Sequence, residues 1–258
     1  MHYLISGLAK SGTTRLFTQV QDAVRAERGE VRTFFEPWED EALSEIVATE
    51  QDTLSKVLIG RVHADNAFLP RFDRHVMIYR DPRDQFLSTL LYLFYDFQIK
   101  GDREGYLSAR EALVKKLEDP HQVSVLDLYD EIAELAGRPR RIVFSKLHAV
   151  QQEFTARLQP FELVYENLID GVATEALGHY LDLEIRNEAN VDADYSRVAR
   201  SKKYGEWRSW FTLEDQAWAE EHWGAHLRSL GYSLDRVTDA PSISKASSVD
   251  YVAQFEPG

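Results

Sequence analysis

The sequence contains no cysteine among its 258 residues. This absence excludes disulfide bonds, thiolate metal sites and a thiol nucleophile. Long apolar stretches are also missing, because the longest, residues 86–97, is shorter than the about 20 residues that a membrane-spanning helix needs. The N-terminal segment lacks the pattern of a signal peptide. We therefore expect a cytoplasmic protein of a reducing compartment, without an integral membrane segment.

Positive charge is also in short supply. The chain has 30 Lys and Arg against 43 Asp and Glu, with a net charge of -13 and an isoelectric point near 5.1. A general nucleic-acid-binding protein is usually basic, so we expect no nucleic-acid partner. If the protein binds an anion, its positive charges must be concentrated locally against a repulsive overall field. The position of each basic cluster is therefore informative.

Short apolar runs alternate with helical patterns along the chain. The strands are predicted at residues 2–6, 31–35, 57–63, 75–80 and 161–165, with helical periodicity between most of them. This alternation predicts an α/β protein with a central parallel sheet of about five strands flanked by helices. We expect one domain over residues 1–235. Residues 236–258, rich in Ser, Asp and Pro, form a tail that is either wrapped on the domain or disordered.

A glycine-framed loop follows the first predicted strand. In "GLAKSGTT", Gly7 and Gly12 have the spacing of the nucleotide-binding pattern G-x-x-x-x-G-K-[ST], and Thr14 supplies its hydroxyl. The residue after Gly12 is Thr13, however, and the lysine is Lys10, inside the loop. Because that pattern's lysine serves the β- and γ-phosphates, its displacement argues against an ordinary ATPase or kinase. A lysine at position 10 could instead reach an oxygen of a leaving group.

The segment "AKSGTT" resembles the 5′-phosphosulfate loop of the sulfotransferases that use 3′-phosphoadenosine 5′-phosphosulfate (PAPS). Four further segments resemble that family in the same order: residues 61–70, 79–88, 163–168 and 200–212. The resemblance is closest to cytosolic, bacterial-type members and extends in part to carbohydrate sulfotransferases. It implies a P-loop-like three-layer fold and transfer of a sulfuryl group from PAPS to a hydroxyl or amine by in-line attack.

The resemblance also implies roles for individual residues. Lys10 would assist departure of the leaving group, and Tyr165 would contact the adenine. Arg15 stands where the family often has a stacking tryptophan, and a guanidinium can also stack on a purine. The remaining cofactor-binding residues are implied for the 5′-phosphate (Lys10, Ser11, Gly12, Thr13, Thr14) and for the 3′-phosphate (Arg80, Ser88, Arg200, Ser201, Lys202, Lys203). Lys202 departs from the family pattern, which has a glycine there.

Two residues compete for the role of catalytic base. His63 falls where the cytosolic members carry their base, at the end of the third predicted strand, and a neutral imidazole could take the acceptor's proton. Glu36, in "FFEPW", resembles the corresponding segment of carbohydrate sulfotransferases, in which a glutamate of this region acts as base. The sequence does not choose between the two.

The implied cofactor is PAPS, with adenosine 3′,5′-bisphosphate as product, and no metal is required. The acceptor would be a small molecule, a lipid or a glycan. We expect residues 94–107 to edge its pocket, with an aromatic wall (Phe68, Tyr92, Phe94, Tyr95, Phe97, Tyr106). Homodimer formation is left open. Two alternatives also stay open, a P-loop nucleotide kinase or NTPase and a catalytically silent nucleotide-binding member.

Overall fold

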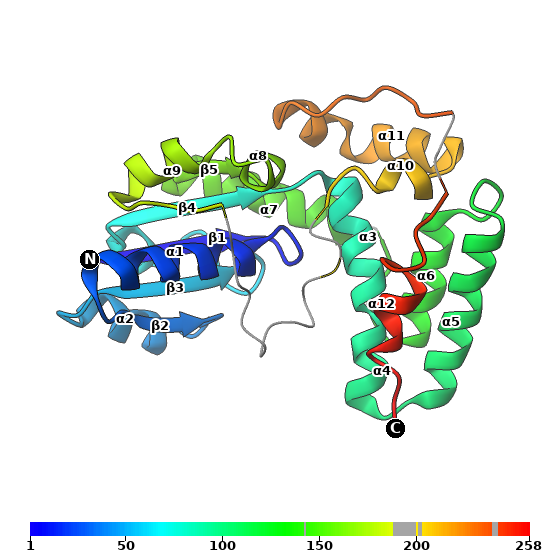
Figure 1. The fold of residues 1–258 in the computed structure, drawn as a ribbon, viewed down its shortest axis with the longest axis horizontal. Helices are drawn as coiled ribbons and strands as arrows, with labels where there is room; N and C mark the ends of the chain where they lie inside the picture. The colour runs from blue at the N-terminus through cyan, green and yellow to red at the C-terminus, as the bar shows by residue number, and fades with distance from the viewer. Residues whose placement is uncertain (142, 188–199, 201–202, 239–241) are drawn as a thin grey trace. The chain divides into compact units, whose positions relative to one another are not determined.

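A computed structural model describes residues 1–141, 143–187, 200, 203–238 and 242–258 (Figure 1). The chain divides into two compact units. The first unit comprises Met1–Arg80 and Leu147–Ser196, and the second comprises Asp81–Lys146 and Arg197–Gly258. Each unit is described by itself below. The domain boundary expected at residue 235 stays a prediction.

The first unit is built on a five-stranded sheet. Its strands are β1 (His2–Gly7), β2 (Arg32–Phe35), β3 (Thr53–Leu58), β4 (Arg74–Tyr79) and β5 (Phe161–Val164). The order is β2-β3-β1-β4-β5, and every neighbouring pair is parallel. The prediction of an α/β fold with a central parallel sheet is therefore confirmed. Because the strands are parallel, their carboxyl ends share one edge, where open α/β sheets bind ligands.

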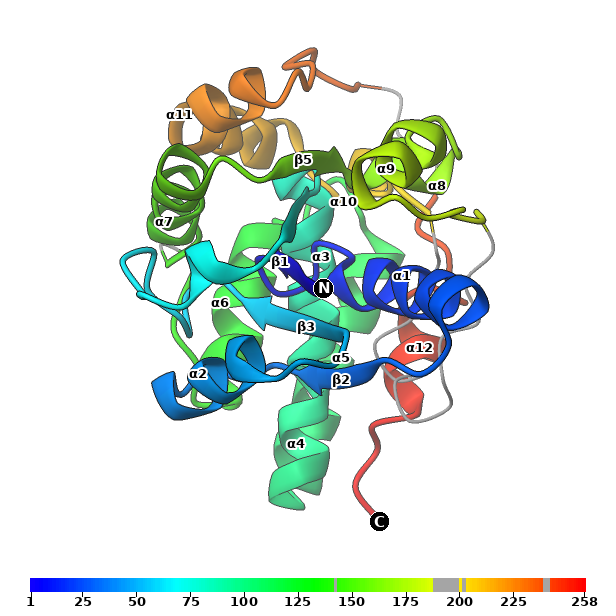
Figure 2. The same cartoon turned by 90° about the vertical axis from the view of Figure 1, so that its left-hand side faces the viewer.

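Helices cover both faces of this sheet (Figure 2). On one face lie α1 (Thr13–Arg28) and α9 (Thr174–Leu181), and on the other lie α2 (Asp40–Ala48) and α7 (Val143–Leu158), of which the part from Leu147 onward belongs to this unit. The short α8 (Tyr165–Ile169) follows β5, and a single 3₁₀ turn, η1 (Leu69–Arg71), precedes β4. The core beneath α1 is apolar and includes fully buried Tyr3, Ile5, Leu16 and Val20.

The position predicted for the third strand is wrong. We expected it at residues 57–63, but β3 runs over Thr53–Leu58. Its first four residues include the polar residues Thr53, Ser55 and Lys56, all of them buried. Parallel strands usually show a continuous apolar run, and these polar residues interrupt it. The strand was therefore predicted at the more apolar residues that follow, 57–63.

The second unit is helical. It contains α3 (Pro82–Tyr92), α4 (Phe94–Lys100), α5 (Arg103–Glu118), α6 (Val125–Leu135), α10 (Trp207–Trp210), α11 (Leu213–Ser229) and α12 (Val249–Ala253). The helices α3 and α4 meet at Leu93. Among the described residues, no helix is both long enough and apolar enough to cross a membrane.

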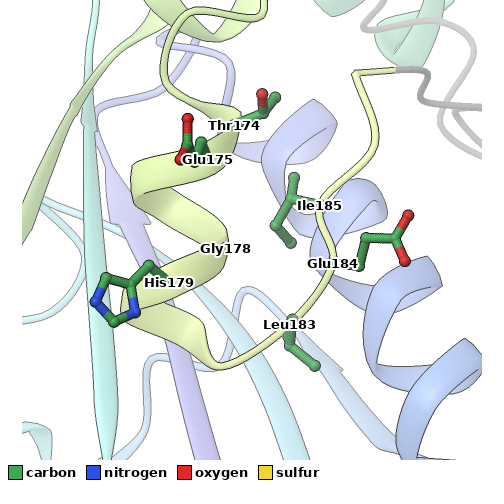
Figure 3. Close-up of a pocket in the computed structure, with 7 residues that line it drawn as sticks. All are labelled: Thr174, Glu175, Gly178, His179, Leu183, Glu184 and Ile185. Carbon is green, nitrogen blue, oxygen red and sulfur yellow. The ribbon is translucent and has the colours of Figure 1, made fainter.

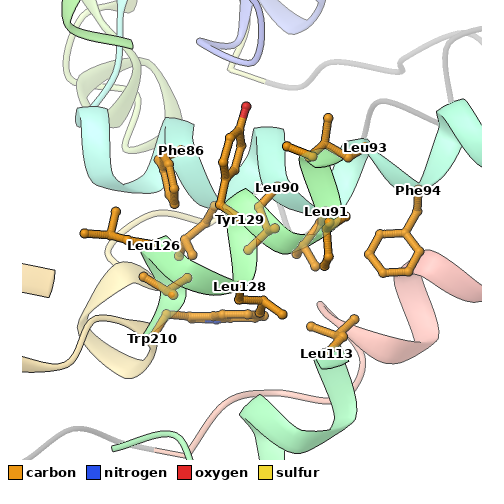
Figure 4. Close-up of a cluster of buried hydrophobic side chains, with 14 of the residues drawn as sticks. Phe86, Leu90, Leu91, Leu93, Phe94, Leu113, Leu126, Leu128, Tyr129 and Trp210 are labelled. Atoms are coloured by element: carbon orange, nitrogen blue, oxygen red, sulfur yellow. The ribbon is translucent and has the colours of Figure 1, made fainter. Parts of the chain in front are cut away.

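One hydrophobic cluster holds the second unit together (Figure 4). It includes Phe94, Phe97 and Tyr106, each with no exposed surface. The prediction that these three line an acceptor pocket is therefore wrong, because they pack inside the core. Val252 and Phe255, from the segment expected as a tail, belong to the same cluster.

Candidate functional site

The loop between β1 and α1 is shaped by its two glycines. A Cβ atom on Gly7 would lie 2.7 Å from the Ser11 Oγ and 2.8 Å from the Ile78 carbonyl oxygen, closer than such atoms approach. Gly12 has a φ of 100°, a left-handed backbone that favours glycine. A Cβ there would overlap the ring of Tyr165. The glycine spacing therefore serves a tight turn packed onto a strand and an aromatic ring.

Lys10 lies within this loop and has a strained backbone conformation. Its φ is 65°, which is uncommon for any residue other than glycine. The Lys10 carbonyl oxygen accepts a hydrogen bond of 3.1 Å from Arg80 Nη1. The Ser11 hydroxyl turns inward and donates to the Leu8 carbonyl oxygen at 2.7 Å. The loop conformation is thus fixed from two sides, and backbone strain of this kind concentrates at functional sites.

Arg80 and Tyr165 stand side by side at the carboxyl edge of the sheet. Arg80 directly follows β4, and its guanidinium carbon is 4.6 Å from the centroid of the Tyr165 ring. Both residues are buried, with 8% and 6% of their surface exposed. Tyr165 opens α8, whereas we expected it to end the fifth strand. The tyrosine therefore supports both the arginine and Gly12 of the loop.

Glu36 follows β2 and is also strained, with a φ of 58°. Its backbone N–H donates to the Lys56 carbonyl oxygen at 2.7 Å. Its carboxylate accepts hydrogen bonds from Lys56 Nζ at 2.7 Å and from Arg61 Nη1 at 3.2 Å. The Lys56 Nζ also donates to the Thr14 hydroxyl at 3.1 Å. The structure thus links the candidate base Glu36 to the loop through a lysine that the sequence analysis missed.

His63 lies in the turns that follow β3, and its side chain is exposed. We expected it at a strand end, but β3 already ends at Leu58. The His63 carbonyl oxygen accepts a hydrogen bond from the Asn66 N–H at 3.1 Å. Its proposed role as base is thus not supported by a strand-end position, and it stays a prediction.

Arg15 is tied to the segment after α9. Its Nη2 donates to the Asn187 carbonyl oxygen at 2.7 Å. Thr13 is buried, whereas Thr14 and Arg15 are partly exposed. Stacking of the Arg15 guanidinium on an adenine stays a prediction and would have to accommodate this bond.

The remaining predicted site residues belong to the second unit. Ser88 lies in α3, with 5% of its surface exposed. Arg200 forms an ion pair of 2.6 Å with Glu206 and donates to the Ser247 carbonyl oxygen at 3.1 Å. Lys203 is exposed. Ser201 and Lys202 lie outside the described residues.

The basic residue Arg83, near the start of α3, has a structural role. Arg83 binds the Asp81 carboxylate with two hydrogen bonds, of 2.9 and 2.7 Å, and lies 3.7 Å from the centroid of the Trp207 ring. Asp84 accepts hydrogen bonds from the backbone N–H groups of Gly205 and Trp207. These contacts fasten the basic, aromatic segment around Trp207 to α3 within the second unit.

A hollow of about 220 Å³ lies between α9 and the segment that follows it (Figure 3). Its lining contains none of the predicted site residues and comprises Thr174, Glu175, Gly178, His179, Leu183, Glu184 and Ile185. Within the described part of the chain, no group of three or more His, Asp or Glu side chains is placed to hold a metal ion. We assign no ligand to this hollow.

Lys56 is the site residue that the sequence analysis overlooked. A lysine within "TLSKVL" gives a weak signal, because a lone lysine is usually exposed. Its position between residues typical of a buried strand is the signal that could have revealed it, since a buried cation must have a partner. Because the third strand was predicted at residues 57–63, Lys56 was not recognised as a strand residue.

Comparison with known proteins gives the fold a name. No protein-family model matches the sequence, and no curated protein matches it significantly. Among solved structures, mouse sulfotransferase SULT7A1 complexed with PAP matches with a TM-score of 0.55 and 12% identity, covering 88% of this chain and 84% of that one. The chain has the sulfotransferase fold. A retinol dehydratase in complex with androsterone and the inactive cofactor PAP also matches, with a TM-score of 0.51 and 13% identity, covering 93% of this chain and 82% of that one.

Proposed function

We propose that this protein is a sulfotransferase that uses PAPS as donor. The acceptor would be a hydroxyl or amine of a small molecule, a lipid or a glycan. One observation carries the proposal: the strained Lys10 loop is held by Arg80 at the carboxyl edge of a parallel sheet. The PAP complexes among proteins of the same fold support this assignment.

The residues present fit the donor's charge. The backbone N–H groups of the loop and the N-terminus of α1 favour an anion such as the 5′-phosphosulfate. Lys10 adds a cation beside them. Arg80 can form charge-assisted hydrogen bonds to the 3′-phosphate, and we retain Ser88 and Arg200 as proposed ligands of that phosphate on the basis of the sequence pattern.

The proposed chemistry is a single in-line displacement. When bound, the donor supplies a sulfuryl group, whose bond to the bridging phosphate oxygen breaks as the acceptor's oxygen or nitrogen bonds to sulfur. Lys10 stabilises the charge that develops on the bridging oxygen, as preorganised cations do at leaving groups. A base on this chain, His63 or Glu36, takes the acceptor's proton.

Calorimetry tests the donor class without a known acceptor. We expect adenosine 3′,5′-bisphosphate to bind with an affinity that is unchanged by adding Mg²⁺ or EDTA. ATP with Mg²⁺ should bind more weakly, because the loop lacks a lysine after Gly12. A clear preference for ATP with Mg²⁺ would favour a nucleotide kinase or NTPase and overturn the proposal.

Replacing Lys10 tests the leaving-group role. We expect Lys10→Ala to fold normally and to lower kcat about 100-fold or more, as removal of one transition-state donor does in other enzymes. The measurement is release of adenosine 3′,5′-bisphosphate from PAPS across a panel of phenols, sugars and lipid alcohols. Lys115→Ala, at an exposed lysine of α5, is the matched control and should keep full turnover.

The two candidate bases are separated with the same assay. His63→Asn and Glu36→Gln each remove a proton acceptor while keeping a similar size. The variant that removes the base should lose most of kcat at saturating acceptor, whereas a change confined to KM indicates a role in acceptor binding. Full turnover in both variants would rule out both assignments.

A further inference from the structure

Lys56 occupies an unusual place for a lysine. It lies within β3, beside Ile5 of β1, and 3% of its side chain is exposed. Burying an ammonium group is costly unless it is paired. Its partners are the Glu36 carboxylate at 2.7 Å and the Thr14 hydroxyl at 3.1 Å, and the ammonium lies 3.9 Å from the centroid of the Phe35 ring. The structure thus maintains a buried cation directly beside the loop.

The identity of its partner in the loop is informative. Thr14 stands at the last position of the pattern G-x-x-x-x-G-K-[ST], and in nucleotide triphosphatases the hydroxyl at this position holds Mg²⁺. Here that hydroxyl oxygen accepts a hydrogen bond from Lys56. Glu36, at the end of the next strand, supplies a carboxylate to the same ammonium. The hydroxyl that holds a metal ion in those loops is therefore bonded to an ammonium group here.

We propose that Lys56 is a built-in cation of the donor site, placed to offset negative charge on the donor's 5′-phosphate. The inference rests on the proposed function, because it assumes that this loop binds a 5′-phosphosulfate. It adds a donor-binding residue that no sequence pattern of the site includes. Glu36 then has a second role, which is to balance the charge of Lys56 when the loop is empty.

These roles predict opposite effects for the two partners. Lys56→Met removes the cation and should weaken binding of adenosine 3′,5′-bisphosphate about 10- to 100-fold, the range of one charge-assisted hydrogen bond. Glu36→Gln keeps an acceptor oxygen for Lys56 but removes the opposing charge. It should therefore leave the affinity for the bisphosphate unchanged or raise it.

A ligand without the 5′-phosphate separates charge from structure. We would titrate wild type and Lys56→Met with adenosine 3′,5′-bisphosphate and with adenosine 3′-monophosphate. The expected result is a loss confined to the bisphosphate, because the monophosphate offers no charge to Lys56. Lys56→Arg, which keeps the cation, should restore much of the lost affinity. Equal losses for both ligands, or wild-type affinity of Lys56→Met for the bisphosphate, would overturn the proposal.

A second buried lysine provides the matched control. Lys116, in the second unit, is fully buried and donates to the carbonyl oxygens of Pro120 and Val123. Lys116→Met makes the same chemical change and should lower stability without altering the affinity for the bisphosphate.

Two further outcomes, a Lys56→Met variant that does not fold and a wild type that binds no ligand, also have a defined meaning. If Lys56→Met does not fold, as judged by circular dichroism, Glu36→Gln carries the test, and weaker binding of the bisphosphate by Glu36→Gln overturns the inference. If wild type binds neither adenosine ligand, the proposed function itself fails. That outcome is distinct from a failure of Lys56 alone.

Discussion

Left-handed backbone recurs at the residues that form the loop site. Gly12, Lys10 and Glu36 have φ values of 100°, 65° and 58°. For a residue other than glycine such a conformation costs about 1–3 kcal/mol, so it persists only where surrounding contacts determine it. The Arg80 bond to the Lys10 carbonyl and the Lys56 bond to Glu36 are contacts of this kind. The strain is therefore held by the same residues that we assign to donor binding.

Gly12 allows a direct test of the loop geometry. Gly12→Ala introduces a Cβ that overlaps the Tyr165 ring and must also adopt a left-handed backbone. We expect the free energy of unfolding to fall by about 2 kcal/mol or more and the affinity for adenosine 3′,5′-bisphosphate to fall with it. Urea unfolding and calorimetry measure the two effects.

Gly101 is the control for that substitution. It has a φ of 65°, and no atom lies within 4 Å of a Cβ added there. Gly101→Ala should cost about 1 kcal/mol, from the backbone alone, and leave ligand affinity unchanged. If Gly12→Ala behaved like Gly101→Ala in both measurements, the contact with Tyr165 would not matter to the loop.

At the scale of helices and strands, one buried carboxylate secures two helix starts in the second unit. Asp215, near the start of α11, completes a capping box with Thr212. Its carboxylate also accepts hydrogen bonds from the Ser124 hydroxyl and the Val125 N–H at the start of α6. Only 1% of Asp215 is exposed. The same side chain thus accepts a hydrogen bond from a backbone N–H at the start of each helix.

Asp215→Ala would leave those donors without their acceptor. We expect a loss of about 2–4 kcal/mol in the free energy of unfolding, because buried donors that lose a charged partner are costly. Asp127→Asn is the comparison, since Asp127 is exposed and pairs with Arg141 at the surface. It should cost less than about 0.5 kcal/mol. Similar losses in the two variants, measured by urea unfolding, would contradict the shared-cap interpretation.

The same scale shows what the sequence could predict. Apolar runs located β1, β2, β4 and β5 to within a residue or two, because buried strands and glycine or proline boundaries leave a local signal. β3 was displaced, since its pairing with β1 and β2 buries Lys56 through partners that are distant in the sequence. For the site, the glycine pattern correctly placed Lys10 in a loop, and a strand end was correctly assigned to Arg80. Neither pattern carries information on the link between Lys56, Thr14 and Glu36.

At the scale of the whole molecule, each unit contains a buried histidine whose pKa is lowered by burial. Burial lowers the pKa of His75, which bonds to the Ser6 hydroxyl at 2.7 Å in the first unit, to about 4. Burial also lowers the pKa of His226, in the second unit, to about 4. In the unfolded chain both would titrate near 6.5. The folded state therefore binds fewer protons than the unfolded state between these values.

The sign of the pH dependence follows from that difference. Stability should be full above about pH 6.5 and should fall as the pH drops toward 4, by about 1–3 kcal/mol for each histidine. His75→Gln should flatten this dependence for unfolding followed by probes in the first unit, and His226→Gln should do so in the second. His121→Gln, at an exposed position, should leave the profile unchanged. A wild-type profile in both buried variants would show that carboxylates alone govern acid unfolding.

The ion pair between Lys56 and Glu36 also limits how this chain can evolve. The two positions are 20 apart in sequence. Replacing Glu36 first would leave a buried ammonium without its counter-charge, and breaking such a pair costs about 3–5 kcal/mol, a large part of the about 5–15 kcal/mol that holds a typical domain folded. Descendants that lose Glu36 should therefore have lost Lys56 as well, because only then does no buried ammonium remain without its counter-charge. Among related sequences, positions 36 and 56 should change together. Relatives that share both residues would form the lineage in which a lysine ammonium serves as the cation of this loop.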